Sequence, residues 1–176
     1  MARPLILVIA AIPVLLAVLI AVPMITSPQI PFSATNSDDV ISIELTKYDI
    51  KRISFGVTDR LSPAKSQILT ISNDGSARYL VTENERPLPE KTMTLERAQV
   101  KKLTALIKET GFMKIPIDSI PADENVDAFT KFSLKVTLNG QVKQIQWAQE
   151  NATSTFVPPI VAMVESELES VIQKFN

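Results

Sequence analysis

The chain has 176 residues, with 18 Lys and Arg against 19 Asp and Glu and a formal net charge of −1. It contains no His and no Cys, so disulfides, thiolate nucleophiles, Ser-His-Asp triads and zinc or copper sites built on imidazole or thiolate are excluded. The balanced charge and the scarcity of aromatic residues also argue against nucleic-acid binding.

The first predicted element is an apolar helix at residues 5–25, which carry no charged side chain. At 1.5 Å per residue such a helix is about 30 Å long, which matches the hydrocarbon core of a bilayer. The apolar core of a signal peptide is about 7–15 residues long and precedes a small-residue cleavage site, so we favour a retained transmembrane anchor at residues 1–25. The alternatives are a cleaved signal peptide, which would make the protein secreted, and a buried soluble helix.

The charges beside this span predict its orientation. Arg3 and the amino terminus precede it, and the next basic residue is Lys47. The positive-inside rule therefore puts the N-terminus in the cytoplasm and the C-terminal part outside a cell membrane that the chain crosses once. The sequon Asn151-Ala152-Thr153 is compatible with an outside location, whereas a lipoprotein anchor is excluded because it needs a Cys.

Residues 26–39 are rich in Ser, Thr, Pro and Asn without periodicity, and we interpret them as a flexible linker. From Val40 onward apolar and polar residues alternate, as is typical of half-buried strands, and this marks an α+β domain over residues 40–176. The first strand has Ile41, Ile43 and Leu45 on one side, and a second strand has Ile53, Phe55 and Val57 on one side.

Two hairpins are predicted from their turn residues. Asn73-Asp74-Gly75 separates strands at residues 66–72 and 77–82, and this turn leaves open which way Tyr79 faces. Asn139-Gly140 predicts a two-residue type I′ turn, because both residues accept the positive φ that this turn needs. The resulting register places Leu134 opposite Ile145 and Phe132 opposite Trp147, on one buried face, with Trp147 as a core residue.

Two helices are predicted from apolar residues at helical spacing. We expect the first over residues 95–110, with Thr94 as its N-cap and Gly111 past its end, and the second from Pro159 onward. The first apolar stripe consists of Val100, Leu103, Leu106 and Ile107. The second consists of Val161, Val164, Leu168, Val171, Ile172 and Phe175, with Glu165, Glu167 and Glu169 expected on the opposite, solvent-facing side.

The order of elements is four strands, a helix, two strands and a helix. The predicted fold class is therefore α+β, with an N-terminal transmembrane helix and an antiparallel sheet of about six strands that has both helices packed on one face. Long connections are expected at residues 83–93 and 112–128. We interpret the charged segment 83–91 as a solvated connector, with an interaction surface as the alternative.

Three motifs follow one another in the order strand, hairpin and capped helix: Ile53-Ser54-Phe55, Asn73-Asp74-Gly75, and the segment from Thr94 to Gly111-Phe112. In this order the chain resembles, over roughly residues 53–172, an uncharacterised family of small extracytoplasmic domains, many of them lipid-anchored. Many members carry C-F-G-x-C-P after the first strand, where this chain has Phe55-Gly56-Val57-Thr58 and no Cys. The family has no known activity, so the resemblance implies an architecture only.

A candidate metal site lies in the second long connection. Asp123, Asn125 and Asp127 match the first three oxygen positions of a calcium loop, D-x-N-x-D. The pattern then fails, because Ala128 stands at the Gly position and Leu134 at the position of the bidentate Glu. The alternative interpretation is a solvated acidic loop, and any calcium site here would be as weak as those of extracellular modules, in the millimolar range.

A second motif, Ser62-Pro63-Ala64-Lys65, matches the S-x-x-K of penicillin-binding enzymes. The companion K-T-G is absent from the sequence, and we interpret the motif as a Ser-Pro turn.

Together these features support a non-enzymatic, membrane-tethered extracytoplasmic domain that acts by binding or as an accessory subunit. It requires no cofactor, and its expected partners are the membrane, through residues 5–25, and a protein of the membrane or envelope. One alternative is a weak calcium-binding or carboxylate-based hydrolase domain, centred on Asp118, Asp123, Glu124 and Asp127. Another is a small subunit of a larger membrane complex.

Overall fold

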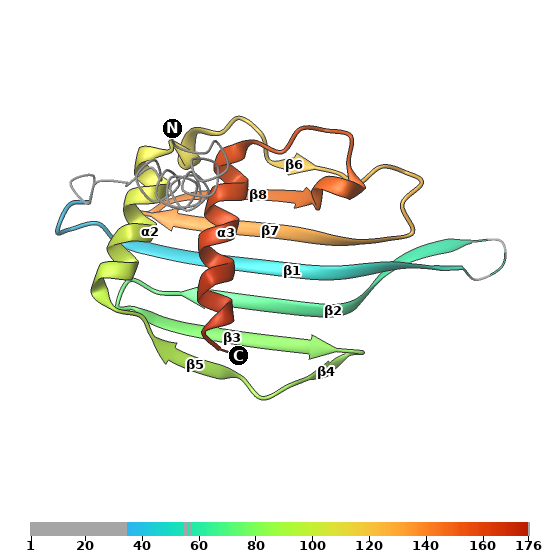
Figure 1. Ribbon diagram of the computed structural model, residues 1–176, viewed down its shortest axis with the longest axis horizontal. Helices are drawn as coiled ribbons and strands as arrows, with labels where there is room; N and C mark the ends of the chain where they lie inside the picture. Colours follow the sequence, from blue (N-terminus) through green and yellow to red (C-terminus); the bar gives the residue numbers. More distant parts are fainter. Residues whose placement is uncertain (1–34, 55, 57, 176) are drawn as a thin grey trace, which may run out of the picture. The chain divides into compact units, whose positions relative to one another are not determined.

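The computed structural model describes residues 35–54, 56 and 58–175, which form an α+β domain with two helices crossing one face of a single sheet (Figure 1). This confirms the predicted fold class for the domain. The predicted transmembrane helix at residues 5–25 lies outside the described residues. Within them, no helix is both long enough and apolar enough to cross a bilayer.

The sheet has eight strands in the order β4-β3-β2-β1-β7-β8-β6, and β5 pairs with β3. All pairs are antiparallel except β6 with β8. Three strands of two to four residues, β4, β5 and β6, form in the two long connections, and the first two predicted strands are one, β1, so the predicted six or so become eight. The bounds are β1 Ile41–Ser54, β2 Asp59–Ile71, β3 Ser76–Glu83, β4 Arg86–Pro87, β5 Lys91–Thr94, β6 Ser119–Ile120, β7 Ala128–Leu138 and β8 Gln141–Ala148.

Strand β1 is one continuous strand, whereas the sequence predicted two. Alternation is clear at Ile41–Leu45 and weakens over the middle of the strand, where polar residues face both sides. The pairing with β7 nevertheless runs without a break from Ile41 to Lys51. Phe55 and Val57, which were expected in the second strand, lie outside the described residues.

Both predicted hairpins are confirmed. Asn139 and Gly140 have φ of 50° and 81°, as a type I′ turn requires, and the register pairs Phe132 with Trp147 and Leu134 with Ile145 as expected. The turn between β2 and β3 contains Gly75 at φ 88°. These turns set the register of four strands by local chain geometry.

The helices are α2, Arg97–Glu109, and α3, Pro159–Gln173, with short 3₁₀ helices η2 at Phe112–Lys114 and η3 at Glu150–Ala152. The predicted N-cap of α2 was wrong. Thr94 ends strand β5, and the cap is Glu96, which forms a reciprocal capping box with Gln99. Gly111 follows the helix at φ 68°, as predicted.

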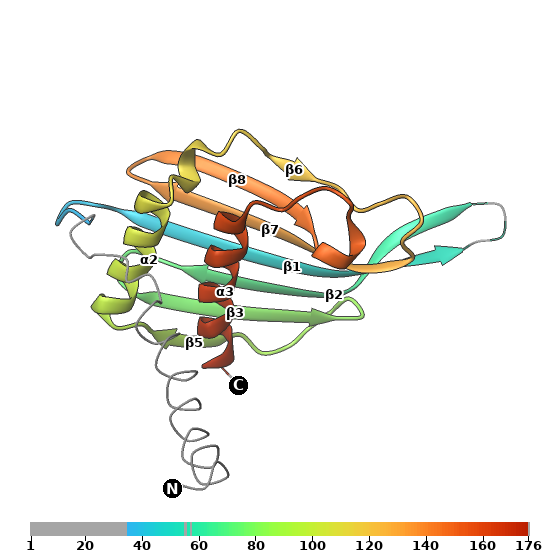
Figure 2. The ribbon, with the colours of Figure 1, turned by 45° about the horizontal axis from the view of Figure 1, so that its top comes forward.

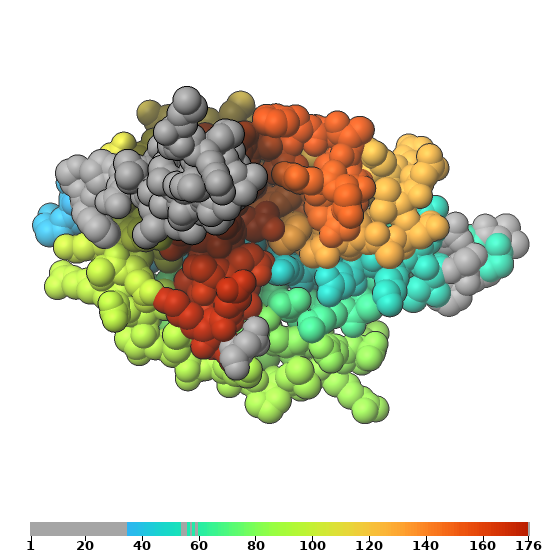
Figure 3. Space-filling view, in the orientation of Figure 1, coloured from blue at the N-terminus to red at the C-terminus, as the bar shows by residue number. Residues whose placement is uncertain are grey.

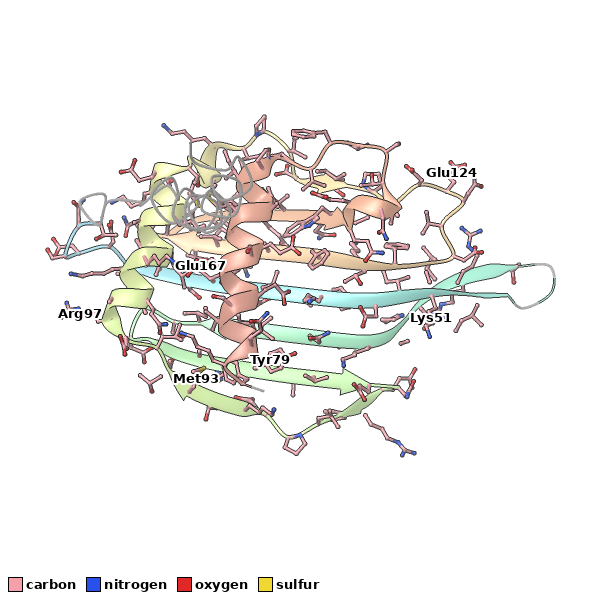
Figure 4. The ribbon with its side chains drawn as sticks, in the orientation of Figure 1. Lys51, Tyr79, Met93, Arg97, Glu124 and Glu167 are labelled. Carbon is pink, nitrogen blue, oxygen red and sulfur yellow. The ribbon has the colours of Figure 1, made fainter. Side chains whose placement is uncertain are left out.

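The turned view in Figure 2 shows α2 and α3 over one face of the sheet, and the buried apolar side chains of the helices and of this face form the core. Trp147 is 2% exposed, which confirms its predicted place in the core. Tyr79, whose direction the sequence left open, is buried against α3, and its ring stacks on Phe175 at 5.4 Å (Figure 4). The buried sheet residues on this face are Ile41, Ile43, Leu45, Leu69, Ile71, Ala77, Tyr79, Phe132, Leu134, Val136, Ile145 and Trp147.

The two ends of the sheet differ. At one end the chain enters the domain at Thr35–Asp39, and the Asp39 carboxylate accepts hydrogen bonds from Lys108, Asn139 and the Asn36 amide. At the other end the β1–β2 hairpin extends beyond the remaining strands as an arm (Figures 1 and 3). In this arm, Arg52–Ser54 pair with β2 alone. The arm therefore stands at the end of the sheet remote from the point of entry.

Candidate functional site

The candidate site lies on the sheet face that the helices leave open, next to the arm. Successive side chains of a strand point to opposite faces of the sheet. Lys47 and Trp147 bind residues of α3 and therefore lie on the covered face. Tyr48, Ile50 and Arg52 therefore project from the open face. Their partners in the register project with them, namely Lys131 and Phe129 on β7 and Leu61 on β2.

A β-bulge determines which β2 residues join this face. Asp49 pairs with Lys65, but the next pair is Ile50 with Pro63, so Ala64 is an extra residue on β2. The predicted Ser-Pro turn at residues 62–65 is therefore wrong, because the segment lies within β2. Pro63 has no backbone N–H, and the strand tolerates it because it lies beyond the last pair of β2 with β3, Lys65 with Glu83, where no neighbouring strand on that side requires a donor.

The loop from Pro121 to Asp127 forms the other wall of the site. The Arg52 guanidinium donates to the Glu124 carbonyl at 2.5 Å and pairs with the Asp127 carboxylate at 3.2 Å, and its backbone N–H donates to the Asp127 carbonyl. At the other end of the loop, Asp123 accepts from the Ser154 amide and hydroxyl at 3.1 and 3.0 Å. Figure 4 shows Glu124 on this loop and Lys51 at the base of the arm, at the same end of the sheet.

Between this loop and the sheet lies a groove of about 320 Å³, which we call the open-face groove. Leu61 is 49% exposed at the arm, while Ile120 and Ala148 are buried beneath the loop. Most of the lining is apolar, and its two cations are Arg52 of β1, which pairs with Asp127, and Lys131 of β7. The apolar residues are Ile50, Leu61, Ile120, Pro121, Ala122, Val126, Phe129 and Ala148, and the polar ones are Arg52, Ser119, Asp123, Glu124 and Lys131.

The predicted calcium ligands lie on this same loop, but each carboxylate has a protein partner of its own. Asp123 binds Ser154 and Asp127 pairs with Arg52, while the Asn125 side chain has no hydrogen bond within the described residues. Asp118, the further carboxylate of the hydrolase hypothesis, pairs with Lys143 at 2.5 Å. Within the described ranges no three acidic side chains are grouped as a metal site would need, and the calcium hypothesis stays a prediction.

A second cavity, of about 260 Å³, lies on the covered face between α3, η3 and the sheet. Phe132 and Trp147 stack at 5.2 Å on its floor, and the Trp147 indole N–H donates to Glu165 at 3.2 Å. Burial raises the pKa of Glu165. Lys47 lies 5.6 Å from the Phe132 ring centre and pairs with Glu169 at 2.7 Å.

These contacts correct the prediction that the three glutamates of α3 face solvent. Glu165 and Glu169 bind the sheet, and Glu167 pairs with Lys102 of α2 at 2.8 Å. The Trp147–Glu165 hydrogen bond and the Lys47–Glu169 ion pair join α3 to the sheet, so we assign these four side chains a structural role.

The remaining predicted surface features do not add to the groove. The segment 83–91 contains β4 and the start of β5, and most of its side chains are exposed. Asn151 of the sequon is exposed on η3. Phe156 is the most exposed large apolar residue in the described chain at 74%, but a single exposed apolar side chain is common on protein surfaces.

No family model matches this sequence, and the comparison with curated proteins also gives no match. The fold is that of an α+β domain, and the character of its site is argued from the geometry of the groove.

Proposed function

We propose that this chain is a membrane-tethered, extracytoplasmic domain that acts by binding, and that it holds a segment of a protein partner in the open-face groove. The observation that carries the proposal is the groove itself, an apolar, solvent-open concavity bordered by a projecting arm. Ligand sites are concave and mostly apolar with few polar groups, and this description fits the groove lining.

The chemistry of the chain supports binding over catalysis. The sequence has no His or Cys to serve as a nucleophile or as a base near neutral pH. At the groove, Asp123 and Asp127 are tied to Ser154 and Arg52 and hold the loop in place. These carboxylates thus contribute to the shape of the site.

The position of the groove also suits a tethered domain. Strand β1 runs from the point of entry at Ile41 to the groove at Ile50, and nine residues at about 3.3 Å each give roughly 30 Å. The tether, predicted from residues 5–25, would therefore attach at one end of the sheet and leave the groove at the other end accessible to a partner.

The test uses a photo-crosslinking amino acid at Leu61 in the full-length chain, expressed in its native membranes. Leu88, on the connection between β4 and β5, is the matched control, because it is the same residue type with a similar exposure of 45% against 49%. We expect a discrete protein adduct from position 61 that is absent from position 88. Equal adducts from both positions, or none from position 61, would overturn the proposal.

The location is tested separately. Protease added to intact cells should digest the domain, and the same protease added to inverted vesicles should leave it intact. Recovery of a mature chain that begins after Ile25 from the soluble fraction would instead support the secreted alternative, and the groove would then act without a tether.

A further inference from the structure

Two polar side chains stand together on the open face of the sheet, and one of them, Lys131, lines the groove. Tyr48 on β1 and Lys131 on β7 are directly paired across the strands, and both are half-buried. Directly paired residues have Cβ atoms about 5 Å apart, so the phenol and the ammonium group can reach one point.

Neither group has a polar partner among the described residues. No acidic side chain there lies within ion-pair distance of Lys131, and the other described Lys and Arg side chains without an ion pair are exposed, whereas Lys131 is half-buried. The Tyr48 hydroxyl has no hydrogen bond in the described part of the chain either. An ammonium group supplies three donors and a phenol supplies one, so the pair presents unused donors beside an apolar concavity.

We infer that Lys131 and Tyr48 bind a carboxylate of the partner segment, while an apolar side chain next to that carboxylate fills the open-face groove. This inference rests on the proposed function and names the chemistry of the segment: an acidic residue within one or two positions of an aliphatic or aromatic one. A charge-assisted hydrogen bond from Lys131 supplies orientation, and burial of the apolar side chain against Ile50 and Phe129 supplies contact area.

The shape of the site favours a protein segment as the occupant. About 320 Å³ is at the lower end of the range for ligand pockets, which suits one or two side chains and not a whole lipid chain. The groove is open to solvent along the arm, so an extended main chain can lie across it with one side chain inserted. Leu61, half exposed at this opening, would then be covered.

The experiment uses the full-length chain in nanodiscs and three soluble peptides, acetyl-Leu-Asp-Leu-amide and its Asn and Lys counterparts. Binding is followed by the amide chemical shifts of Ile50, Phe129 and Ala148. We expect the Asp peptide to bind about tenfold more tightly than the Asn peptide, because a hydrogen bond to a charged group is worth more than one to a neutral group. The Lys peptide should bind most weakly.

Lys131→Gln should abolish the preference for the Asp peptide, and Tyr48→Phe should reduce it. Lys135→Gln is the matched control, since Lys135 lies on the same strand and the same face and is exposed. Its substitution should leave the preference unchanged. Unchanged melting temperatures will show that all three variants fold.

Equal affinity for the Asp and Asn peptides, a preference that survives Lys131→Gln, or no binding of any peptide would overturn the inference. Shifts at the same amides caused by phosphatidylglycerol in the nanodisc, without peptide, would also overturn it in favour of a lipid headgroup. Because the peptides require no native partner, this test can fail while position 61 still crosslinks to a protein, and the two proposals are distinguished.

Discussion

The turn between β2 and β3 should be intolerant of any side chain at Gly75, because this glycine meets two separate constraints. Its φ of 88° lies where L residues are rarely found, and a Cβ built on it would lie 2.7 Å from the Leu95 carbonyl oxygen. The Leu95 N–H also donates to the Gly75 carbonyl at 2.8 Å, so the turn is bound to the segment that leads into α2.

The cost of Gly75→Ala follows from these contacts. A positive φ costs a non-glycine residue about 1–2 kcal/mol. The new Cβ also overlaps the Leu95 carbonyl oxygen, and the turn must move away to relieve this overlap. That movement weakens the hydrogen bond from the Leu95 N–H to the carbonyl of residue 75, which is worth about 1 kcal/mol. Both contacts involve backbone atoms, which cannot rotate away as a side chain would. We expect the free energy of unfolding to fall by about 3 kcal/mol.

Gly140→Ala is the matched control. Gly140 has φ of 81°, but a Cβ there has nothing within 4 Å. Only the cost of the positive φ, about 1–2 kcal/mol, should apply. Urea unfolding of the full-length chain, followed by the fluorescence of its only tryptophan, measures both variants. If the two substitutions destabilise the protein equally, the close approach to Leu95 has no energetic weight and the reasoning is refuted.

Hydrogen bonds from Asn139 and Lys108 lower the pKa of Asp39 to about 2. The ionised Asp39 carboxylate therefore stabilises the fold fully above the usual pKa of 3.8, and this stabilisation is lost as the pH falls toward 2. In urea titrations, Asp39→Asn should lower the free energy of unfolding by about 1–2 kcal/mol at pH 7 and leave it unchanged near pH 2. Burial raises the pKa of Glu165, so its ionised carboxylate lowers the stability of the fold at a pH above that pKa. Glu165→Gln should therefore raise the melting temperature at pH 7, and this gain should vanish at pH 3, where Glu165 is protonated. Calcium should leave the melting temperature unchanged, because Asp123 and Asp127 would have to give up Ser154 and Arg52 to bind it. A rise in melting temperature with calcium that is lost in the double variant Asp123→Ala, Asp127→Ala would instead support the calcium hypothesis.

Local geometry made the hairpins predictable from the sequence. A two-residue turn at Asn139-Gly140 permits only one register, and that register puts Phe132, Leu134, Val136, Ile145 and Trp147 on one buried face. The stripe of α2 was predictable for the same reason, since Val100, Leu103 and Ile107 recur at the helical period and all are buried.

Features that depend on distant partners were missed. Glu165 follows Val161 by four residues and precedes Leu168 by three, so the helical period alone places it beside the stripe and not opposite to it. Its partner is the Trp147 indole, whose direction depends on how α3 crosses the sheet. In the same way, Thr94 precedes a helical pattern in the sequence but forms the end of strand β5, where it pairs with Ser76 of β3. This pairing between distant segments cannot be inferred from the local sequence.

The groove itself was not predictable, because it depends on the bulge at Ala64. Without the extra residue, Ile50 would pair with Ala64 and Leu61 would project from the opposite, covered face of the sheet. With it, Leu61 lies opposite Arg52 on the open face, and Arg52 in turn holds the loop that forms the opposite wall. One inserted residue in β2 thus brings an apolar side chain of the arm to the same surface as Lys131. Elsewhere the open face carries mainly hydroxyl, amide and charged side chains. The register change at Ala64 therefore gives the open face next to the arm its apolar character, and with it a surface on which a partner can be bound.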